Sequence, residues 1–364
     1  MKRRDFSRGL AVLTRTAFAR AAALSSAAVW RLNAAPDAGD GSMTDVAGVK
    51  VGHYTESRRP TGCTVLLFEN GAAAGVDVRG SAPGTRETDL LNPINTVQQV
   101  QAIVLAGGSA FGLDAASGVV RFLEEHHLGY RVGDIVVPIV PAAILYDLGI
   151  GGDAQIRPTA ESGYKACQAA TSGRVPEGNV GAGAGATVGK IFGLKQAMKS
   201  GLGSASLRVG DTGIVVGAIV AVNAAGDVVD PKSAKIIAGA RKPDGSGFMD
   251  SMARIRAGYG VRADRSTNTT IGVVATNVAL DKAQATKVAQ MAHDGLARTI
   301  NPVHTPSDGD TIFAVATGAV AARADHGAIG ALAAEVMAQA VLRAVMSARG
   351  IAGLPSYSDL RSRG

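Results

Sequence analysis

Short runs of strongly apolar residues recur along the chain and constrain its fold more than any other feature. Each run is rich in Val and Ile and is bounded by Gly, Asp or Asn, which is typical of β-strands. Several runs lack the polar alternation of a strand with one wet face, so they indicate strands buried between layers. The runs span residues 48–54, 63–69, 102–108, 134–140, 212–223, 270–276 and 311–317.

Longer segments with helical patterns separate these runs. One helix is expected over 111–127 and a second over 281–298, where Asp281 and Gln284 have the spacing of a capping box. A third, over 329–349, carries an apolar stripe and ends before Gly350, which is expected just after the C-cap. The chain has no internal repeat and no Pro-rich linker. The pattern therefore predicts one large α/β domain of sheets covered by helices.

The positive charge of the chain is concentrated at its N-terminus. Residues 1–35 hold seven Lys and Arg residues against Asp5 alone, and so carry six of the net seven positive charges. The remainder is almost neutral and only 4% of all residues are aromatic, which argues against a nucleic-acid-binding surface. Arg3 and Arg4 precede an Ala-rich stretch, as in a twin-arginine signal. Residues 1–35 are therefore interpreted as a leader to the periplasm, and the alternative is a cytoplasmic protein starting at Met43.

Metal, redox and membrane proteins are not expected from this sequence. Cys63 and Cys167 lie far apart without a CxxC motif, and the six histidines are scattered, so no metal-ligand spacing is present. No uninterrupted apolar run reaches the roughly 18 residues of a membrane span. Both cysteines are interpreted as small buried hydrophobic residues.

Two glycine-rich segments match known motifs only in part. Residues 181–190 fit G-x-G-x-x-A, yet they follow a polar segment, and Ile191 stands where a P-loop requires Ser or Thr. They are interpreted as a site of close backbone packing. Ser109 lies at a strand-to-helix turn like a nucleophile elbow, although the second glycine of that motif is replaced. With Asp308 and His326 downstream, a serine triad remains an alternative to a simple helix cap at Ser109.

The junction between Asn268 and Thr269 is the most unusual one in the chain. Residues 241–268 are polar, basic and Gly-rich, which indicates a long exposed loop, and a buried strand follows at once. Cleavage there leaves an N-terminal Thr, whose α-amine, with a reference pKa of about 8, can take the proton of its own hydroxyl. The local sequence also fits a glycosylation sequon or an ordinary strand start. Asp308 and Asp310 precede another strand and can point to one face, or form a simple turn.

Five motifs, taken together, resemble the P1 family of N-terminal nucleophile hydrolases. They are LAGGSAFGLDAASGV, ILYDL, GAGAGATVGK, NTTIGVVATN and HTPSDGDTIFAV, and the resemblance covers residues 44–348. The family includes L-aminopeptidase/D-esterase-amidases, β-peptidyl aminopeptidases and nylon-oligomer endo-hydrolases. It implies a four-layer αββα sandwich that cleaves itself before the nucleophile. The expected products are an α chain of residues 36–268 and a β chain of residues 269–364.

The resemblance implies a role for each of six residues, four of which surround the scissile bond. Thr269 corresponds to the nucleophile, and Asn223 to the side chain that donates to the oxyanion. Tyr146 matches the family tyrosine at the same site. Lys190 corresponds to the lysine near the nucleophile in the nylon-oligomer branch.

Asp308 and Asp310 match a pair of acidic positions, of which the second faces the free amine. The aminopeptidase branch has serine at the positions of Thr269 and Asp308, so this chain departs from that branch twice. A strict aminopeptidase specificity is therefore not expected.

The function implied is a self-processing amide hydrolase of the aminopeptidase, amidase or esterase type, working through an acyl-enzyme without metal or cofactor. Its expected partners are small peptide or amino-amide substrates and further copies of the αβ unit, with neither nucleic acid nor membrane. Two alternatives stay open. One is an acyltransferase resembling ornithine acetyltransferase, and the other is an unprocessed, non-catalytic protein that binds small molecules.

Overall fold

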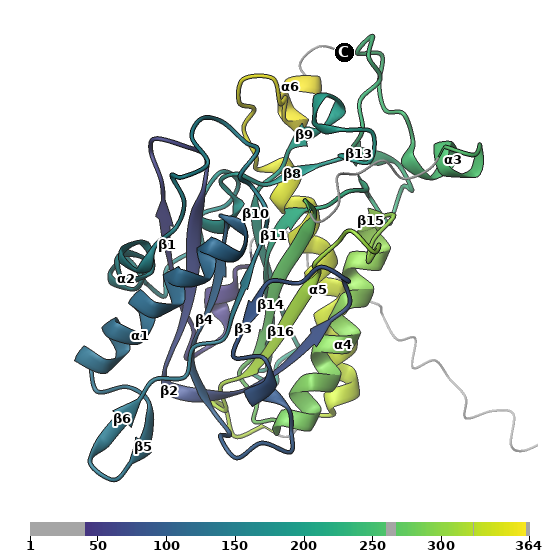
Figure 1. Cartoon of the computed structure of the whole chain (residues 1–364). Helices are drawn as coiled ribbons and strands as arrows, with labels where there is room; N and C mark the ends of the chain where they lie inside the picture. The colour runs from purple at the N-terminus through teal and green to yellow at the C-terminus, as the bar shows by residue number, and fades with distance from the viewer. Residues whose placement is uncertain (1–40, 260–266, 323, 362–364) are drawn as a thin grey trace, which may run out of the picture. The chain divides into compact units, whose positions relative to one another are not determined.

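The computed structural model describes residues 41–259, 267–322 and 324–361, and the fold is given for these ranges. The predicted leader and residues 260–266 of the predicted loop lie outside them. Nine strands of the described chain form one large mixed sheet. The 17-residue strand β2 (Gly62–Val78) runs through it and divides it into two halves. Helices cover the outer face of each half (Figure 1).

The first half of the sheet is built around the beginning of β2. Residues 62–67 of β2 pair antiparallel with β1 (Lys50–Thr55), and residues 63–67 pair antiparallel with β4 (Val100–Ala106). Two shorter strands, β7 (Ala142–Ile144) and β3 (Thr85–Arg86), continue the sheet beyond β4. Helices α1 (Ala115–Glu125) and α2 (Ala160–Gln168) pack on the outer face.

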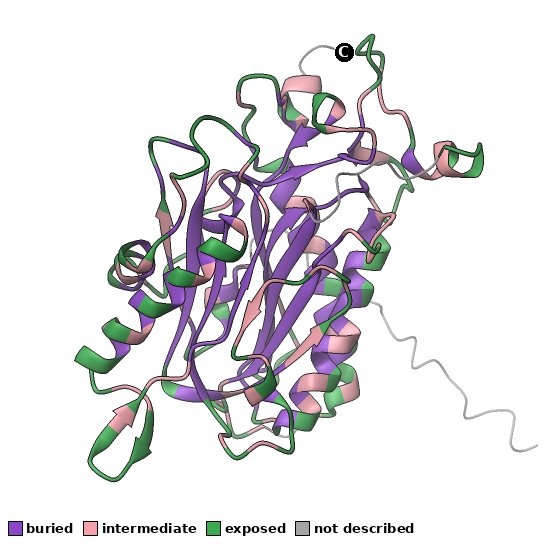
Figure 2. Ribbon diagram, in the orientation of Figure 1, coloured by how far each residue is buried: buried purple, intermediate pink, exposed green. Residues whose placement is uncertain are grey.

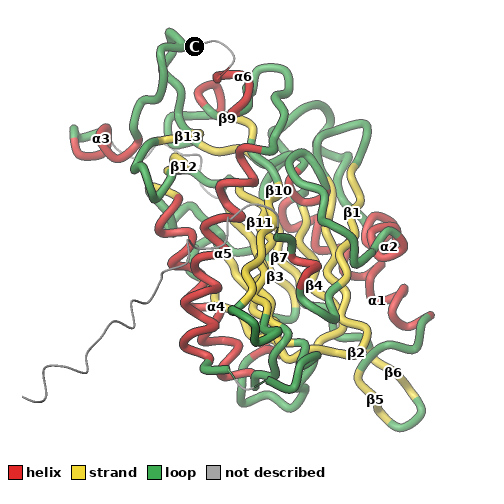
Figure 3. The backbone as a smooth tube through the Cα atoms, turned by 180° about the vertical axis from the view of Figure 1, so that it is seen from behind, coloured by secondary structure: helices red, strands yellow, loops and turns green. Residues whose placement is uncertain are grey.

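The second half of the sheet continues from the end of β2. Residues 73–78 pair with β16 (Thr311–Ala316), which runs parallel to β14 (Thr269–Thr276). The antiparallel strands β11 (Val215–Asn223) and β10 (Leu202–Arg208) complete this half. Helices α4 (Lys282–Thr299) and α5 (His326–Met346) lie side by side on its outer face (Figure 3).

Three hydrophobic clusters fill the spaces between successive layers. The first lies between α4, α5 and the second half of the sheet, and the third between the first half and α1 and α2. The middle cluster joins the two halves face to face, with Leu66 and Phe313 in its centre. Figure 2 shows the sheet strands almost continuously buried, as the apolar runs predicted. The layers follow the order helix, sheet, sheet, helix, which confirms the four-layer αββα prediction.

Smaller elements surround this sandwich. Two of them are short sheets, formed by β12 (Asp227–Val229), β13 (Ile236–Ala238) and β15 (Ile300–Asn301), and by β8 (Thr187–Val188) and β9 (Met198–Lys199). Strands β5 (Tyr130–Val132) and β6 (Ile135–Val137) form a separate hairpin. The short helices α3 (Ser251–Arg256) and α6 (Tyr357–Arg361) follow later in the chain.

Helix α5 is long and apolar enough to cross a membrane, judged by length and composition alone. In the fold, its apolar side packs against α4, β10 and β11, and the greater part of its most apolar window is buried inside the protein. These contacts explain its composition, because a helix between a sheet and another helix has apolar neighbours on most sides. Helix α5 is therefore a core helix of the sandwich.

Some local predictions are wrong, for physical reasons. The run 134–140 contains β6, whose side chains are half-buried or exposed, because the β5–β6 hairpin extends beyond the sandwich. Helix α5 ends at Met346 with Ser347 as its C-cap, so Gly350 does not follow the helix end as predicted. A Cβ atom at Gly350 would lie 2.1 Å from a carboxylate oxygen of Asp359, so a larger residue there would displace the Asp359 side chain. The capping box of Asp281 and Gln284 is confirmed.

Candidate active site

Strand pairing places the Asn268–Thr269 junction in the centre of the sandwich. Thr269 is the first residue of β14, and Asn223, the last residue of β11, is its antiparallel partner. On the other side, β14 and β16 are parallel with Ile271 opposite Thr311, so the segment before β16 lies beside the junction. A bridge between Asn268 and Asp308 extends this pairing by backbone contacts. Segments distant in sequence therefore meet at one peptide bond.

The carbonyl group of Asn268 is contacted by two hydrogen-bond donors. The Thr269 hydroxyl Oγ1 lies 2.5 Å from the carbonyl oxygen of Asn268, and the backbone N–H of Gly309 donates to the same oxygen at 3.0 Å. Thr269 is 3% exposed. A Cβ atom at position 309 lies only 2.8 Å from Thr269 Oγ1, so the glycine gives the hydroxyl room. The Thr269 hydroxyl and the Gly309 N–H are thus both placed on the carbonyl oxygen of Asn268.

Lys190 and Asn223 form a buried polar cluster next to this bond. Lys190 Nζ donates to the side-chain oxygen of Asn223 at 2.7 Å, to its backbone oxygen at 3.0 Å and to the Thr267 carbonyl at 2.9 Å. The Asn223 amide donates to the carbonyls of Tyr146 at 3.0 Å and Thr267 at 3.3 Å. The backbone N–H of Thr187 fixes the orientation of the Asn223 amide by donating to Oδ1 at 3.0 Å. Burial lowers the pKa of Lys190 to about 7, against the opposing effect of nearby carboxylates.

Tyr146 contributes to the site in two ways. Its backbone carbonyl accepts from Asn223, as described above. Tyr146 also lines a cavity of about 130 Å³ together with Thr187, Lys190 and Thr267. We call this space the active-site cavity, because it borders the residue two positions before Thr269.

The two predicted carboxylates differ sharply in their hydrogen bonding. Asp310 Oδ1 accepts the backbone N–H of Thr270 at 2.7 Å, and its Oδ2 accepts from the His304 ring at 2.8 Å. Asp308 Oδ2 accepts the N–H of Thr305 at 2.7 Å, whereas its Oδ1 is buried without a partner among the described residues. Burial and the neighbouring Asp310 raise the pKa of Asp308 to about 6. Asp308 therefore holds an oxygen that is free to accept a proton.

The structure adds three contributors that the sequence analysis did not select. Gly309 donates its N–H to the Asn268 carbonyl, and Thr187 orients Asn223. His304 has a φ of 55° and uses both its backbone N–H and its ring to hold Asp310. Gly309 and His304 belong to the motif HTPSDGDTIFAV, in which only the two carboxylates are predicted as site residues. Because their contacts depend on strand pairing, the motif by itself does not identify them.

The residues of the alternative serine triad do not come together in the described structure. Ser109 starts a 3-10 helix (η3, Ser109–Asp114) with φ 54°, and no described contact joins its hydroxyl to a histidine or carboxylate. His326 is exposed at the start of α5 beside Asp325. The simple helix cap predicted at Ser109 is also wrong, because Gly108 is the N-cap.

The glycine-rich segment 181–190 packs closely against its neighbours, as predicted. A Cβ atom at Gly183 lies 2.1 Å from the backbone nitrogen of Leu202. Lys190, the last residue of this segment, lies near the Asn268–Thr269 junction, because its Nζ donates to the carbonyl of Thr267. Among residues 41–259, 267–322 and 324–361, no group of three or more His, Cys, Asp or Glu side chains is placed to hold a metal ion.

Comparisons with known proteins agree with this geometry. The model of peptidase family S58 matches residues 41–357. An uncharacterized aminopeptidase of Mycobacterium tuberculosis is 45% identical over 347 residues, which cover 88% of this chain and 97% of the relative. A 6-aminohexanoate-oligomer endohydrolase of Paenarthrobacter ureafaciens is 33% identical over 316 residues, or 82% of this chain and 84% of the relative.

Two solved structures share the fold at low sequence identity. The L-aminopeptidase D-Ala-esterase/amidase of Ochrobactrum anthropi, described as a variant of the Ntn-hydrolase fold, has a TM-score of 0.65 and 21% identity, covering 88% of this chain and 93% of that one. A β-aminopeptidase of Burkholderia sp. has a TM-score of 0.64 and 22% identity, covering 88% and 92%. Fold, sequence relatives and family match therefore agree with the resemblance found in the motifs. The chain belongs to peptidase family S58 and is a hydrolase of amide bonds.

Proposed function

We propose that this hydrolase cuts its own chain between Asn268 and Thr269 and then uses Thr269 as an N-terminal nucleophile on linear amides. The observation that carries the proposal is the contact of the Thr269 hydroxyl with the Asn268 carbonyl, which also accepts the Gly309 N–H. Nucleophile, scissile carbonyl and oxyanion donor therefore lie together before any cleavage, which removes most of the cost of orienting them.

Self-cleavage proceeds by an N-to-O acyl shift. The Thr269 oxygen attacks the Asn268 carbonyl carbon, and the hydroxyl proton passes to the unpartnered oxygen of Asp308. The Gly309 N–H stabilises the negative charge that develops on the Asn268 oxygen. The C–N bond then breaks as the nitrogen of Thr269 takes this proton from Asp308, which returns Asp308 to its carboxylate form and leaves an ester between Asn268 and Thr269. Water hydrolyses the ester and gives a carboxylate on Asn268 and a free Thr269.

In the cleaved enzyme, the α-amine of Thr269 takes the hydroxyl proton during attack on a substrate amide. The leaving amine receives that proton, and water hydrolyses the resulting acyl-enzyme. In the uncleaved chain, Lys190 Nζ and the Asn223 amide both donate to the Thr267 carbonyl. When the chain that ends at Asn268 leaves the site, Lys190 Nζ and the Asn223 amide lose the Thr267 carbonyl as their acceptor. Both donors can then hold the carbonyl oxygen of a substrate at the same position. This geometry supports the predicted oxyanion role of Asn223.

The remaining roles follow from the same arrangement. Asp310 fixes the backbone of Thr270, one residue after the nucleophile, and together with Asp308 provides negative charge for the new ammonium group. Tyr146 is expected beside Asn223 at the oxyanion. In support of this role, Tyr146 borders the active-site cavity, and its backbone carbonyl accepts a hydrogen bond from the Asn223 side chain. We expect an amide hydrolase of this kind to act on peptides, amino amides or ω-amino-acid oligomers; one relative is named as an uncharacterized aminopeptidase and another as a 6-aminohexanoate-oligomer endohydrolase.

A substitution at the nucleophile tests the proposal. Purified protein should give two chains, with the smaller one beginning TTIGVV, as read by N-terminal sequencing. Thr269→Ala should stay a single folded chain without amidase activity, because the attacking oxygen is absent from both reactions. Thr269→Ser is the matched control and should still be cleaved, since it keeps the hydroxyl.

Three results contradict the proposal. They are an intact wild-type chain after long incubation, a smaller chain with another N-terminus, or a Thr269→Ala protein that hydrolyses amides normally. Product analysis with and without an added amine separates hydrolysis from acyl transfer to that amine.

A further inference from the structure

The turn that precedes β16 holds both carboxylates of the site with two successive backbone N–H groups. The N–H of His304 donates to Asp310 Oδ2 at 3.2 Å. The next N–H, that of Thr305, donates to Asp308 Oδ2 at 2.7 Å. The φ of 55° at His304 is left-handed, a conformation in which neighbouring N–H groups can point toward nearby anions. His304 is therefore the residue at which the backbone turns toward the two carboxylates.

The ring of His304 adds a further contact to Asp310. Its Nδ1 lies 2.8 Å from Asp310 Oδ2, the oxygen that also accepts the backbone N–H of His304. Because an ionised carboxylate can only accept, the ring nitrogen carries the proton and donates it. Asp310 Oδ1 accepts the N–H of Thr270 at 2.7 Å. Three donors thus fix the Asp310 carboxylate, and two of them belong to His304.

A second histidine fixes the orientation of the His304 ring. His293 on α4 is buried, and its ring meets that of His304 edge to face with centroids 4.8 Å apart. His293 Nε2 lies 3.0 Å from the backbone carbonyl of Asp77 on β2 and donates to it. Burial lowers the pKa of His293 to about 4, so this ring is neutral at neutral pH. The His304 ring therefore packs against an uncharged aromatic neighbour that is itself held by a hydrogen bond.

The other nitrogen of the His304 ring has no such use. Nε2 is buried without a hydrogen-bond partner among the described residues. A buried polar atom without a partner lowers stability, and an apolar side chain of similar size would fill this space without that cost. The contact between Nδ1 and Asp310 is therefore the feature that distinguishes a histidine from an apolar residue at this position.

The contact bears on the reaction because Asp310 lies beside the nucleophile. Its bond to the N–H of Thr270 places the carboxylate one residue from Thr269, whose new α-amine it faces in the proposed function. A carboxylate that rotates away from this position leaves the amine without its counter-charge. The direction of the Asp310 side chain therefore matters as much as its presence.

We propose that His304 is a positioning residue for amide hydrolysis, whose Nδ1–H group holds the Asp310 carboxylate in the orientation that pairs with the α-amine of Thr269. The inference rests on the proposed function and adds to it a residue that acts on the nucleophile through Asp310 alone.

Two substitutions at His304 separate the ring donor from the rest of the residue. His304→Leu removes Nδ1, so kcat should fall about tenfold while KM changes less than about twofold, because substrate binding does not use this contact. His304→Asn is the conservative variant, since Asn tolerates a left-handed φ and its side-chain amide can donate to Asp310. Its kcat should stay within about threefold of the wild-type value. The substrate is alanine p-nitroanilide or 6-aminohexanoyl p-nitroanilide, whichever the wild type hydrolyses faster, and only self-cleaved protein is assayed.

Control variants account for backbone strain and folding. His127→Leu is the matched control, because His127 has a φ of 57° but is exposed, and no described contact joins its ring to a carboxylate. Its kcat should equal that of the wild type. If His304→Leu does not fold, His304→Gly replaces it, since glycine adopts this φ without strain and keeps the backbone N–H. Its kcat should fall as predicted for His304→Leu.

A double variant tests whether His304 acts through Asp310. In Asp310→Asn the negative charge is already absent, so adding His304→Leu should change kcat by less than about twofold. A further loss of about tenfold would instead show that the ring supports the packing of the site independently of Asp310.

The outcomes separate the inference from the proposed function. A wild-type kcat in His304→Leu, a change in KM alone, equal losses in His304→Leu and His304→Asn, or additive losses with Asp310→Asn each overturn the role of His304. All four leave hydrolysis at Thr269 standing. If self-cleaved wild type releases p-nitroaniline from neither substrate, the proposed function fails together with the inference.

Discussion

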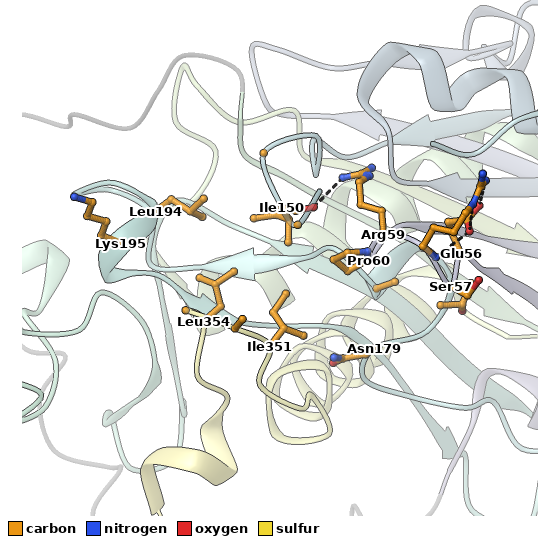
Figure 4. Close-up of a pocket in the computed structure, with 17 residues that line it drawn as sticks. Glu56, Ser57, Arg59, Pro60, Ile150, Asn179, Leu194, Lys195, Ile351 and Leu354 are labelled. Atoms are coloured by element: carbon orange, nitrogen blue, oxygen red, sulfur yellow. Dashed lines mark hydrogen bonds and ion pairs between the residues drawn. The ribbon is translucent and has the colours of Figure 1, made fainter. Parts of the chain in front are cut away.

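Two buried clusters of charged side chains border the loop that carries Tyr146, and they differ in how completely hydrogen bonds satisfy them. In the first, Arg59 and Asp147 are both 0% exposed and 2.8 Å apart. Asp147 also accepts the N–H of Gly108 at 2.9 Å and the Thr61 hydroxyl at 2.7 Å. Arg59 also donates to three backbone carbonyls, one of which is drawn with its hydrogen bond in Figure 4. Every charge there has a partner.

In the second cluster, around Thr269, some groups have no partner. Asp308 Oδ1 and both side-chain polar atoms of Asn268 are buried without a hydrogen bond among the described residues. Burial moves the pKa values of Asp308 to about 6 and of Lys190 to about 7, so both titrate near neutral pH. We call the Arg59–Asp147 group the closed cluster, because each of its charges is paired, and the group around Thr269 the open cluster, because some of its polar atoms have no partner. The comparison indicates that the closed cluster fixes the shape of the site, whereas the open cluster keeps groups that can transfer protons.

Breaking the closed cluster should have the largest effect on stability. Arg59→Met leaves Asp147 as an uncompensated buried charge, so the free energy of unfolding should fall by about 3–5 kcal/mol. Lys190→Met should cost less, about 1–3 kcal/mol, because it leaves hydrogen-bond acceptors without a donor but no unpaired buried charge bonded to it, and the residue of one of these acceptors, Thr267, lines a cavity. Urea unfolding of both variants, each combined with Thr269→Ala so that all chains are intact, measures the difference.

The same pair of variants separates stability from chemistry. With Thr269 present, Lys190→Met should lose activity while remaining folded. If Lys190→Met is destabilised as strongly as Arg59→Met, the distinction between the two clusters is wrong.

The next prediction concerns Asp310, the fully bonded carboxylate inside the open cluster. Asp310→Asn keeps the shape but replaces an acceptor with a donor facing His304, and it removes negative charge near the Thr269 amine. We expect kcat to fall roughly 100-fold, and the pH–activity profile to move to lower pH, because an amine without a counter-ion loses its proton more readily. Only the self-cleaved fraction is assayed, with chain ratios checked by mass spectrometry.

Asp230→Asn is the matched control for this prediction. Asp230 also accepts a backbone N–H and a serine hydroxyl, but on the surface, at 2.9 and 2.7 Å. Its kcat should stay at the wild-type value. A processed Asp310→Asn enzyme with wild-type kcat and pH profile would show that Asp310 only completes a turn.

The sequence predicts the layers of this fold better than its details. Apolar runs such as 270–276 and 311–317 become central strands, because residues without polar alternation are stable only where both faces are covered. The run 134–140 is also rich in Val and Ile, but it contributes β6 to an exposed hairpin, since burial depends on which elements lie nearby and not on composition alone. The resemblance supplied the four layers, which local patterns do not specify.

The sequence likewise predicts some residues of the candidate site and misses others. The motifs identify residues with reactive side chains, and the structure brings Thr269, Lys190 and Asn223 together as the resemblance implies. The contribution of Gly309 could not be predicted, because it comes from a backbone N–H whose direction is set by the pairing of Asn268 with Asp308. His304 was also missed, because its contact with Asp310 depends on a left-handed backbone conformation that the sequence does not reveal.

The smallest expected effect, about tenfold per pH unit, concerns the rate of self-cleavage. If Asp308 accepts the hydroxyl proton, its carboxyl must be ionised, so the rate should rise with pH until the pKa of about 6 is passed. The Lys190 ammonium holds Asn223 and the Thr267 carbonyl, and it loses its proton above about pH 7. The rate should therefore be greatest between about pH 6 and 7 and fall on both sides.

Freshly purified precursor, mixed into buffers of constant ionic strength and followed by gel densitometry, gives this profile. Asp308→Asn should slow cleavage and abolish its rise with pH on the acid side, because the titrating group is gone. Lys190→Met should abolish the fall on the alkaline side, because the lysine whose deprotonation causes it is gone. A wild-type profile that keeps rising through pH 8, or an Asp308→Asn profile with an unchanged acid side, assigns the proton to another group. The unpartnered oxygen of Asp308 would then be only a buried polar atom, and the contrast between the open and the closed cluster would lose its chemical meaning.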